Sequence, residues 1–153
     1  DADTLIASTD AWLKEKRSMI PKRDTLRSST DYLASLNLLA SSNPANKMAV
    51  DYLLCYHLLS KDIRSFTNAY NRYVKDTSSL LPRIYGEALL ISLLNSKATD
   101  KEVQSYGISP DLIREFAENT RLYEQSNGRG ELLQEKFGKS YWFYFHFAKM
   151  DTK

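Results

Sequence analysis

The sequence of 153 residues has little glycine, a single cysteine and almost no net charge. Its five glycines, set against ten tyrosines, argue against both disorder and a turn-rich all-β fold. The lone cysteine, Cys55, excludes an internal disulfide, which fits a reducing compartment without excluding an oxidising one. Because Cys55 falls in a very apolar segment, we predict that it fills the core. With a formal charge of +2, no global field selects nucleic acid or an anionic membrane as a partner.

Long apolar runs are also absent. No stretch of about 18 uncharged apolar residues occurs, so the sequence predicts no membrane span. No basic start followed by an apolar stretch marks a signal peptide either. The first residue is Asp1 rather than Met, so we expect a processed product or a piece of a longer protein. Hydrophobic residues make up 42% of the chain, enough for one domain over 1–153 to build a core without metal or disulfide.

The segment 43–73 predicts two packed helices and sets the fold class. An Asn-Pro turn at 43–46 opens it, and residues 48–59 are then apolar or aromatic at almost every position. After a polar corner at 61–62, large side chains recur at spacings of three and four, which is one face of a second helix. That face is formed by Ile63, Phe66, Tyr70 and Tyr73.

Further segments carry helical periodicity or helix start signals. The segment 82–95 is apolar nearly all round, which predicts a central helix. Ser109 and Pro110 predict an N-cap and a first helical residue, and Gly138 predicts a C-terminal cap. The sequence therefore predicts seven or eight helices and no strand, which is an all-α fold. The remaining helices are expected at 4–16, 24–40, 110–126, 131–137 and 140–150.

The helix pair resembles a known repeat. The Asn-Pro turn at 43–46 followed by two helices is similar to the junction between tetratricopeptide repeats. Leu53 falls where that repeat has its first large leucine, and Tyr70 where its second helix has a large aromatic residue. The resemblance implies antiparallel helix pairs in a right-handed array. Where the repeat has small residues, this chain has larger ones, so its pairs must pack further apart or at other angles. These larger residues are Leu54, Phe66 and Tyr73.

A more specific resemblance covers roughly residues 36–148. It is to an uncharacterised bacterial family in which a multi-spanning membrane region precedes a soluble, repeat-like C-terminal region. The resemblance implies that this chain is the soluble tail of a membrane protein in the cell envelope. It brings no established activity, so it implies no catalytic residue. The matching motifs lie at 48–54, 58–63, 81–89 and 141–144.

Three residues at the start of the central helix form the first candidate site: Arg83, Tyr85 and Glu87. Arg83 and Glu87 are four apart and can pair on one face of the helix. Charged groups entering a core could bind a polar ligand, together with His57 in an enzymatic alternative. The favoured interpretation is that the ion pair ties neighbouring helices together, as such pairs commonly do in helical repeats.

The aromatic segment 141–147 is the second candidate. Its rings could form a contact surface for a protein, base or sugar, and we place Tyr141, Trp142 and Tyr144 on that surface. On a helix the rings point in all directions, however, so some must face inward. Capping the end of the helical stack is the favoured interpretation, because a repeat array needs its last helix covered.

Other motifs predict little chemistry. The only histidines, His57 and His146, are far apart, and no metal-ligand spacing occurs, so neither metal nor cofactor is expected. Cys55 and His57 lie on different sides of one helix, which argues against a catalytic couple. The Gly128–Gly130 segment lacks the pattern of a phosphate loop and predicts a turn. A basic cluster is expected to be a solvated face, with contact to nucleic-acid phosphates or an anionic membrane surface as the alternative; it comprises Lys14, Lys16, Arg17, Lys22, Arg23 and Arg27.

The sequence therefore favours a non-enzymatic interaction or scaffold module that packs against a protein or the rest of a longer chain. The alternative is a ligand-binding or enzymatic helical domain with a pocket around Arg83, Tyr85 and Glu87. No nucleic-acid partner is expected, and membrane association is expected only through a parent protein.

Overall fold

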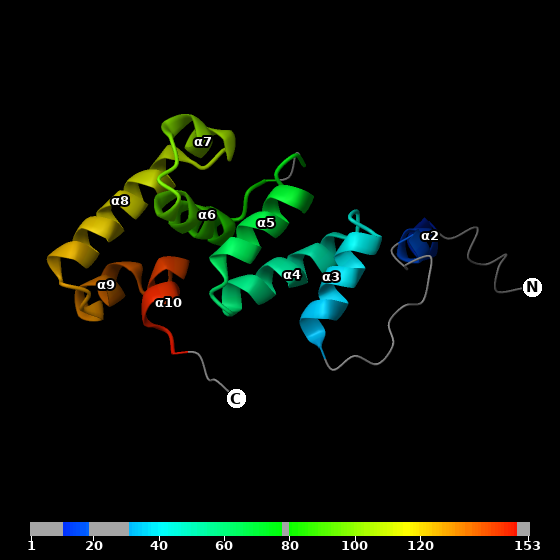
Figure 1. Ribbon diagram of the computed structural model, residues 1–153, viewed down its shortest axis with the longest axis horizontal. Helices are drawn as coiled ribbons and strands as arrows, with labels where there is room; N and C mark the ends of the chain where they lie inside the picture. Colours follow the sequence, from blue (N-terminus) through cyan, green and yellow to red (C-terminus); the bar gives the residue numbers. More distant parts are fainter. Residues whose placement is uncertain (1–10, 19–30, 78–79, 150–153) are drawn as a thin grey trace, which may run out of the picture. The chain divides into compact units, whose positions relative to one another are not determined.

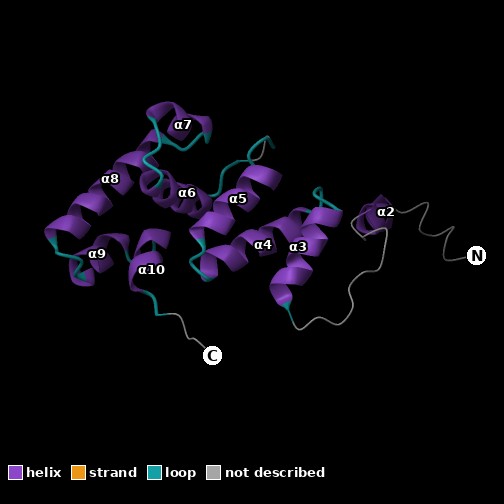
Figure 2. Ribbon diagram, in the orientation of Figure 1, coloured by secondary structure: helices purple, strands orange, loops and turns teal. Residues whose placement is uncertain are grey.

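The computed structural model describes residues 11–18, 31–77 and 80–149. Within these ranges there are nine helices and no strand, which confirms the predicted all-α class (Figure 2). The helices are α2 (Ala11–Ser18), α3 (Tyr32–Ser42), α4 (Lys47–Leu59), α5 (Ile63–Tyr73), α6 (Arg83–Asn95), α7 (Asp100–Ser105), α8 (Pro110–Gln125), α9 (Gly130–Phe137) and α10 (Tyr141–Phe147).

The chain forms two compact units, residues 1–56 and 57–153 (Figure 1). Helix α4 is continuous from Lys47 to Leu59 and therefore passes from one unit into the next. Because a helix joins the units, the prediction of one domain over 1–153 stays a prediction.

In the first unit, α3 begins later than predicted. Asp31 has an extended backbone, and its side chain accepts a hydrogen bond from the Ala34 amide at 3.1 Å, so Asp31 caps a helix that starts at Tyr32. The prediction of one continuous helix over 24–40 was therefore wrong, because the N-cap at Asp31 interrupts it. Residues 24–30, like the start of the predicted helix 4–16, lie outside the described residues.

Helix α4 buries only one of its sides. Its buried positions recur three or four residues apart, as one helical face requires, and they include Val50, Leu53, Leu54 and Leu58. Cys55 lies on the opposite side and is exposed, so the prediction that it fills the core was wrong. The prediction failed because both sides of this helix are apolar. In such a helix, hydrophobic periodicity does not distinguish the buried side from the exposed side.

Helix α5 has the predicted amphipathic face. Asp62 caps its start by accepting a hydrogen bond from the Ser65 amide at 3.0 Å. Three of its four predicted core positions are buried: Ile63, Phe66 and Tyr70. The fourth, Tyr73, is half-buried in the last turn of the helix.

Helix α6 is the central element of the second unit, as predicted. Seven consecutive residues, Tyr85 to Ile91, are buried, and the helix contacts α5, α8 and α10. Because Gly86 has no side chain, Leu112 of α8 can pack closely against the backbone of α6. A Cβ at position 86 would lie 2.8 Å from the Leu112 Cδ2. Close approach on several sides explains why this helix has no wide polar face.

The short helix α7 was not predicted. Its start is a capping box, in which the Thr99 hydroxyl accepts from the Glu102 amide while the Glu102 carboxylate accepts from the Thr99 amide at 2.7 Å. The pattern Thr-x-x-Glu at 99–102 is the sequence signal that could have revealed it. The helix has only six residues and no buried side chain, so it carries no hydrophobic periodicity.

The last three helices lie at the predicted places, although α10 ends at Phe147 and not near residue 150 as predicted. Ser109 caps α8 with Pro110 as first residue, Gly138 is the C-cap of α9, and Ser140 caps α10. The segment 141–147 is helical, which confirms that its aromatic residues do not form a strand.

Replacing Gly138 with alanine is expected to lower the free energy of unfolding by about 1–3 kcal/mol. A Cβ at this position would lie 2.4 Å from the backbone oxygen of Gln134, so the link between α9 and α10 would have to move. Urea denaturation followed by circular dichroism measures the change. Gly107→Ala is the control with open space around its Cβ, although its positive φ adds a strain of its own. An unchanged midpoint for Gly138→Ala contradicts the prediction.

Candidate functional site

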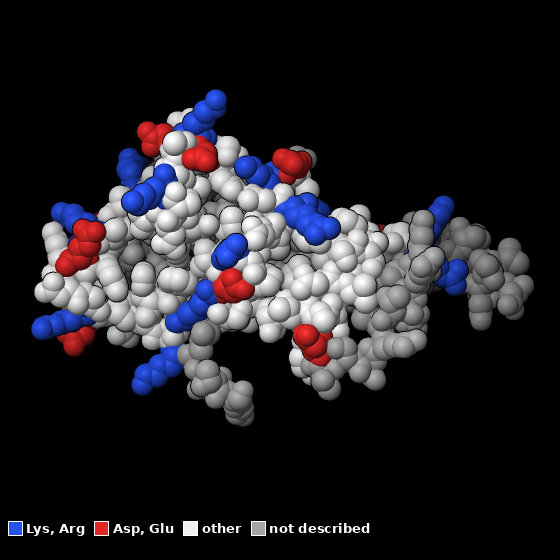
Figure 3. Space-filling model, viewed as in Figure 1, with Lys and Arg blue, Asp and Glu red and all other residues white. Residues whose placement is uncertain are grey.

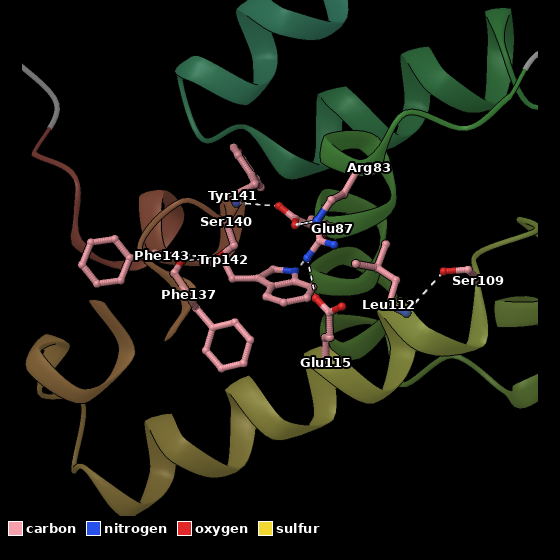
Figure 4. Close-up of polar contacts among 10 residues, drawn as sticks. All are labelled: Arg83, Glu87, Ser109, Leu112, Glu115, Phe137, Ser140, Tyr141, Trp142 and Phe143. Atoms are coloured by element: carbon pink, nitrogen blue, oxygen red, sulfur yellow. Dashed lines mark hydrogen bonds and ion pairs between the residues drawn. The ribbon is translucent and has the colours of Figure 1, made fainter. Parts of the chain in front are cut away.

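Arg83, at the start of α6, bridges two carboxylates. Its Nε donates to Glu87 Oε1 at 2.8 Å, and its Nη2 pairs with Glu115 of α8 (Figure 4). Hydrogen bonds to these two carboxylates raise the pKa of Arg83 above its ordinary value, and the bond to Glu115 has the larger effect. The Arg83 side chain is 61% exposed, so the ion pair lies at the surface, whereas the Glu87 side chain is buried. The predicted Arg83–Glu87 pair is therefore present, with an added partner from a distant helix.

Glu87 is the buried anchor of this network. Its side chain is only 4% exposed, and its second carboxylate oxygen accepts the Tyr141 amide at 2.6 Å (Figure 4). The Trp142 indole nitrogen also donates to the backbone oxygen of Glu87, at 2.9 Å. A carboxylate at the start of α10 is favourable because the free amides of a helix N-terminus carry partial positive charge. The favoured structural interpretation, that the ion pair ties helices together, agrees with these contacts.

Tyr85 does not join this network. It is buried and packs against α5, with ring centroids 5.6 Å from Phe66 and 6.3 Å from Tyr70. Two residues along a helix turn the side chain by about 200°, so Tyr85 points away from Arg83 and Glu87. Grouping Tyr85 with Arg83 and Glu87 as one candidate site was therefore wrong.

The start of α10 is also buried. Trp142 has no exposed surface and packs between Phe116 and Phe137, with centroids 5.2 and 5.9 Å away. The Tyr141 hydroxyl donates to the Leu58 backbone oxygen at 2.8 Å, and burial raises its pKa above the ordinary value. Both residues were placed on an exposed surface, which was wrong, because their side of α10 packs onto α6 and α9.

Of the six residues that the sequence analysis singled out on α6 and α10, two reach solvent. Arg83 is exposed, and Tyr144 is half-buried with its hydroxyl donating to the Leu59 backbone oxygen at 2.7 Å. Lys61 lies beside that ring, with its Nζ 5.4 Å from the centroid. Whether Arg83 and Tyr144 contact a partner stays a prediction.

A charged cleft of about 520 Å³ opens beside Arg83. Its lining comes from α6, α8, α9 and the start of α10, so the fold brings together residues that are far apart in sequence. The Lys136 Nζ pairs with Glu118 Oε1 at 2.5 Å, which leaves most of the charges in internal ion pairs. Neither His57 nor Tyr85 lines it. The lining residues are Arg83, Glu87, Glu115, Glu118, Lys136, Phe137, Lys139 and Ser140.

Sequence reasoning found two of these residues and missed the rest. Glu115, Glu118 and Lys136 have the spacing of ordinary solvated helix faces, and Lys139 lies in the turn between α9 and α10. No pattern in the sequence around these residues predicts that α8 and α9 lie opposite α6 at the cleft. Only the Arg83–Glu87 spacing was visible locally.

A further candidate site, which the sequence analysis did not predict, is the exposed side of α4. We call it the α4 surface. It consists of Met48, Tyr52, Cys55, Tyr56 and Leu59. Four of them are large apolar side chains that are 59%, 62%, 39% and 65% exposed, and the cysteine is exposed as well. In the view of Figure 3, charged side chains are sparse over α3 and the first part of α4. Solvent exposure of a continuous apolar stripe is unusual for a helix that already buries its opposite side.

Other site types find little support in the described residues. There, no three histidine, cysteine or carboxylate side chains gather as metal ligands. None of the helices within these ranges is long and apolar enough to cross a membrane. Within the basic cluster, the described residues Lys14, Lys16 and Arg17 are exposed on α2.

Both histidines have a lowered pKa. Burial is the main cause for His57, partly offset by the charge of Asp62. His146 is exposed, but its ring stacks on Tyr123, and partial desolvation is the main cause of its lowered pKa, to which the positive charge of Lys61 adds. In the unfolded chain each histidine returns to an ordinary pKa of about 6.5.

The free energy of unfolding is therefore expected to fall when the pH drops below about 6.5. Above that value both states are neutral at the histidines. Below it the unfolded chain takes up protons first, so stability declines by at most about 1.4 kcal/mol per pH unit for His57, and by less for His146, whose exposed side chain is screened by water. Urea titrations at pH 7.5 and 5.5 measure the change, and His57→Gln and His146→Gln should each reduce it. Stability that rises on acidification contradicts the prediction. Asp62, whose pKa is lowered mainly by the Ser65 amide, acts in the same direction only at much lower pH.

Comparison with known proteins adds one finding. A family of unknown function (DUF6057) matches residues 4–148. The chain belongs to this family. The match covers almost the whole sequence, including both candidate sites, and it agrees with the expected domain of unknown function. No curated protein and no solved structure matches the chain.

Proposed function

We propose that this member of the family is a non-enzymatic helical interaction module. The observation that carries the proposal is the α4 surface, an apolar stripe on the outward side of a well-formed helix. Removing such side chains from water stabilises a complex by roughly 25 cal/mol per Å² of apolar area. A helix face with this pattern is also the ordinary docking element of helical interaction modules.

The partner is either another protein or the remainder of a longer chain. The parent protein is proposed to be a bacterial membrane protein with this chain as its soluble tail. The support is the resemblance over roughly 36–148, together with the family match over 4–148. We further propose that α4 and α5 form the first pair of a tetratricopeptide-like array, because a three-residue corner joins two helices of similar length.

Site-specific photo-crosslinking tests the interaction role. A photoreactive phenylalanine analogue replaces Tyr52 in the organism that makes the protein, and a matched variant carries it at Arg121. Arg121 is exposed on α8 and does not line the charged cleft. We expect a covalent adduct of defined mass from position 52 and none from position 121. Equal labelling at both positions, or no adduct from position 52, overturns the proposal.

A second candidate function is the binding of a small polar ligand in the charged cleft. Its support is the volume of about 520 Å³, within the range of known ligand pockets, and the presence of Arg83 and Glu87 in the lining. Calorimetry with amino acids and dicarboxylates tests it. Binding that is lost in Lys139→Met but kept in Arg121→Met supports the cleft. No heat with any of these probes at millimolar concentration argues against it.

A further inference from the structure

We propose that the charged cleft binds a zwitterion, a ligand with an ammonium group at one end and a carboxylate at the other, such as a short peptide with free termini. The inference rests on the second candidate function and names its class of ligand. It is carried by the charges that the ion pairs of the cleft leave uncompensated. All residues that line the cleft belong to the second unit, 57–153.

The negative charge in excess lies around Arg83. One guanidinium pairs there with two carboxylates, those of Glu87 and Glu115, so the three groups together carry a charge of −1. Glu87 cannot present this charge to a ligand, because its side chain is only 4% exposed and its second oxygen already accepts the Tyr141 amide. Glu115 is 40% exposed and lines the cleft (Figure 4). An ammonium group of a ligand can therefore pair at Glu115.

The positive charge in excess is that of Lys139. The other lysine of the cleft, Lys136, is neutralised by its ion pair with Glu118. Lys139 is exposed, lines the cleft and forms no ion pair with a carboxylate in the part of the chain that the structure describes. A carboxylate of a ligand can therefore pair at Lys139.

Charge complementarity favours a ligand that carries both signs. Three basic and three acidic side chains line the cleft, so its net charge is zero. A ligand that is only an anion meets the excess negative charge at Glu115, and a ligand that is only a cation meets Lys139. Each would therefore face one like charge, which lowers its affinity relative to a zwitterion.

The size of the cleft suits a peptide of about three residues. A sphere of 520 Å³ is about 10 Å across, and three extended residues span about 10 Å. The buried ring of Phe137 adds an apolar wall to the lining. Because Glu115 and Lys139 both reach solvent, each ion pair with the ligand is expected to raise the affinity by only about two- to fivefold.

Three probes with one backbone test the proposal on the full chain. Triglycine is a zwitterion at pH 7, N-acetyltriglycine has only the carboxylate, and triglycine amide has only the ammonium group. Titrations of the isotope-labelled chain, followed by NMR, measure the three affinities. We expect triglycine to bind about two- to fivefold more tightly than either of the other probes.

Two variants assign the two ends of the ligand. Lys139→Met should lower the affinity for triglycine to that for triglycine amide, without lowering the affinity for the amide itself. Glu115→Gln should lower the affinity for triglycine to that for N-acetyltriglycine, without lowering the affinity for the acetylated probe. Arg121→Met, outside the cleft, is the matched control and should change none of them. Circular dichroism checks that all three variants are folded.

The outcomes separate this inference from the function on which it rests. If the three probes bind equally and Lys139→Met weakens them all, the zwitterion is overturned and the cleft stays a site for polar ligands. If none of the three binds, the inference is again overturned, and calorimetry with dicarboxylates decides whether the cleft takes another ligand. No heat in that measurement removes both, and the interaction role of the α4 surface is tested separately by photo-crosslinking.

Discussion

Replacing Trp142 with alanine is expected to lower the free energy of unfolding by about 3–5 kcal/mol, the largest effect of any single change considered for this chain. The side chain has no exposed surface and lies where α6, α8, α9 and α10 meet (Figure 4). Its removal leaves a cavity between Phe116 and Phe137 that these rings cannot fill without moving. Because a domain of this size is stable by only about 5–15 kcal/mol, such a loss is a large fraction of the total.

The chain contains its own control for this experiment. Trp12 is 60% exposed on α2, so Trp12→Ala should cost far less than Trp142→Ala. Trp142→Phe separates packing from hydrogen bonding, because it keeps a ring but removes the donor to the Glu87 backbone oxygen. Urea denaturation followed by far-ultraviolet circular dichroism measures all three variants. Equal costs for the two alanine variants contradict a core role for Trp142.

The helices could be predicted from sequence wherever one local signal was strong. The face of α5 follows from spacings of three and four, and the start of α8 follows from Ser109 and Pro110. Both signals act within a turn or two of the chain, which is the range over which propensity and capping operate. The order of the larger helices was accordingly readable. Helix α7 was missed because its only signal is a capping box with no apolar face behind it.

The sites could be predicted only in part, because they depend on which helices meet. The spacing of Arg83 and Glu87 revealed their pairing, but nothing local indicated that Glu115 would complete it from α8. On α10 the aromatic composition suggested a surface, whereas packing against α6 buries Tyr141 and Trp142. On a helix that is apolar on both sides, or aromatic all round, the buried side is chosen by the neighbouring helices. Periodicity alone cannot make that choice.

Replacing Glu87 with glutamine is expected to lower the free energy of unfolding by about 1–3 kcal/mol. Glutamine keeps the size of the side chain but removes the negative charge that the Arg83 guanidinium and the Tyr141 amide both contact. Charge-assisted hydrogen bonds inside a protein are stronger than neutral ones, and water cannot replace a partner here because the side chain is only 4% exposed. The loss should loosen the attachment of α10 to α6.

The same arginine supplies the matched control. Glu115→Gln removes the other carboxylate bound to Arg83, but that side chain is 40% exposed, so water and salt screen the pair and the expected cost is about 0–1 kcal/mol. Denaturant midpoints compare the two variants, and hydrogen exchange at the start of α10 should rise in Glu87→Gln only. If both variants lose the same stability, Glu87 acts as a surface ion-pair partner and not as the anchor of α10. A larger loss for Glu87→Gln alone places the structural weight of this cluster inside the fold, which leaves the outward side of α4 as the stronger candidate for contact with a partner.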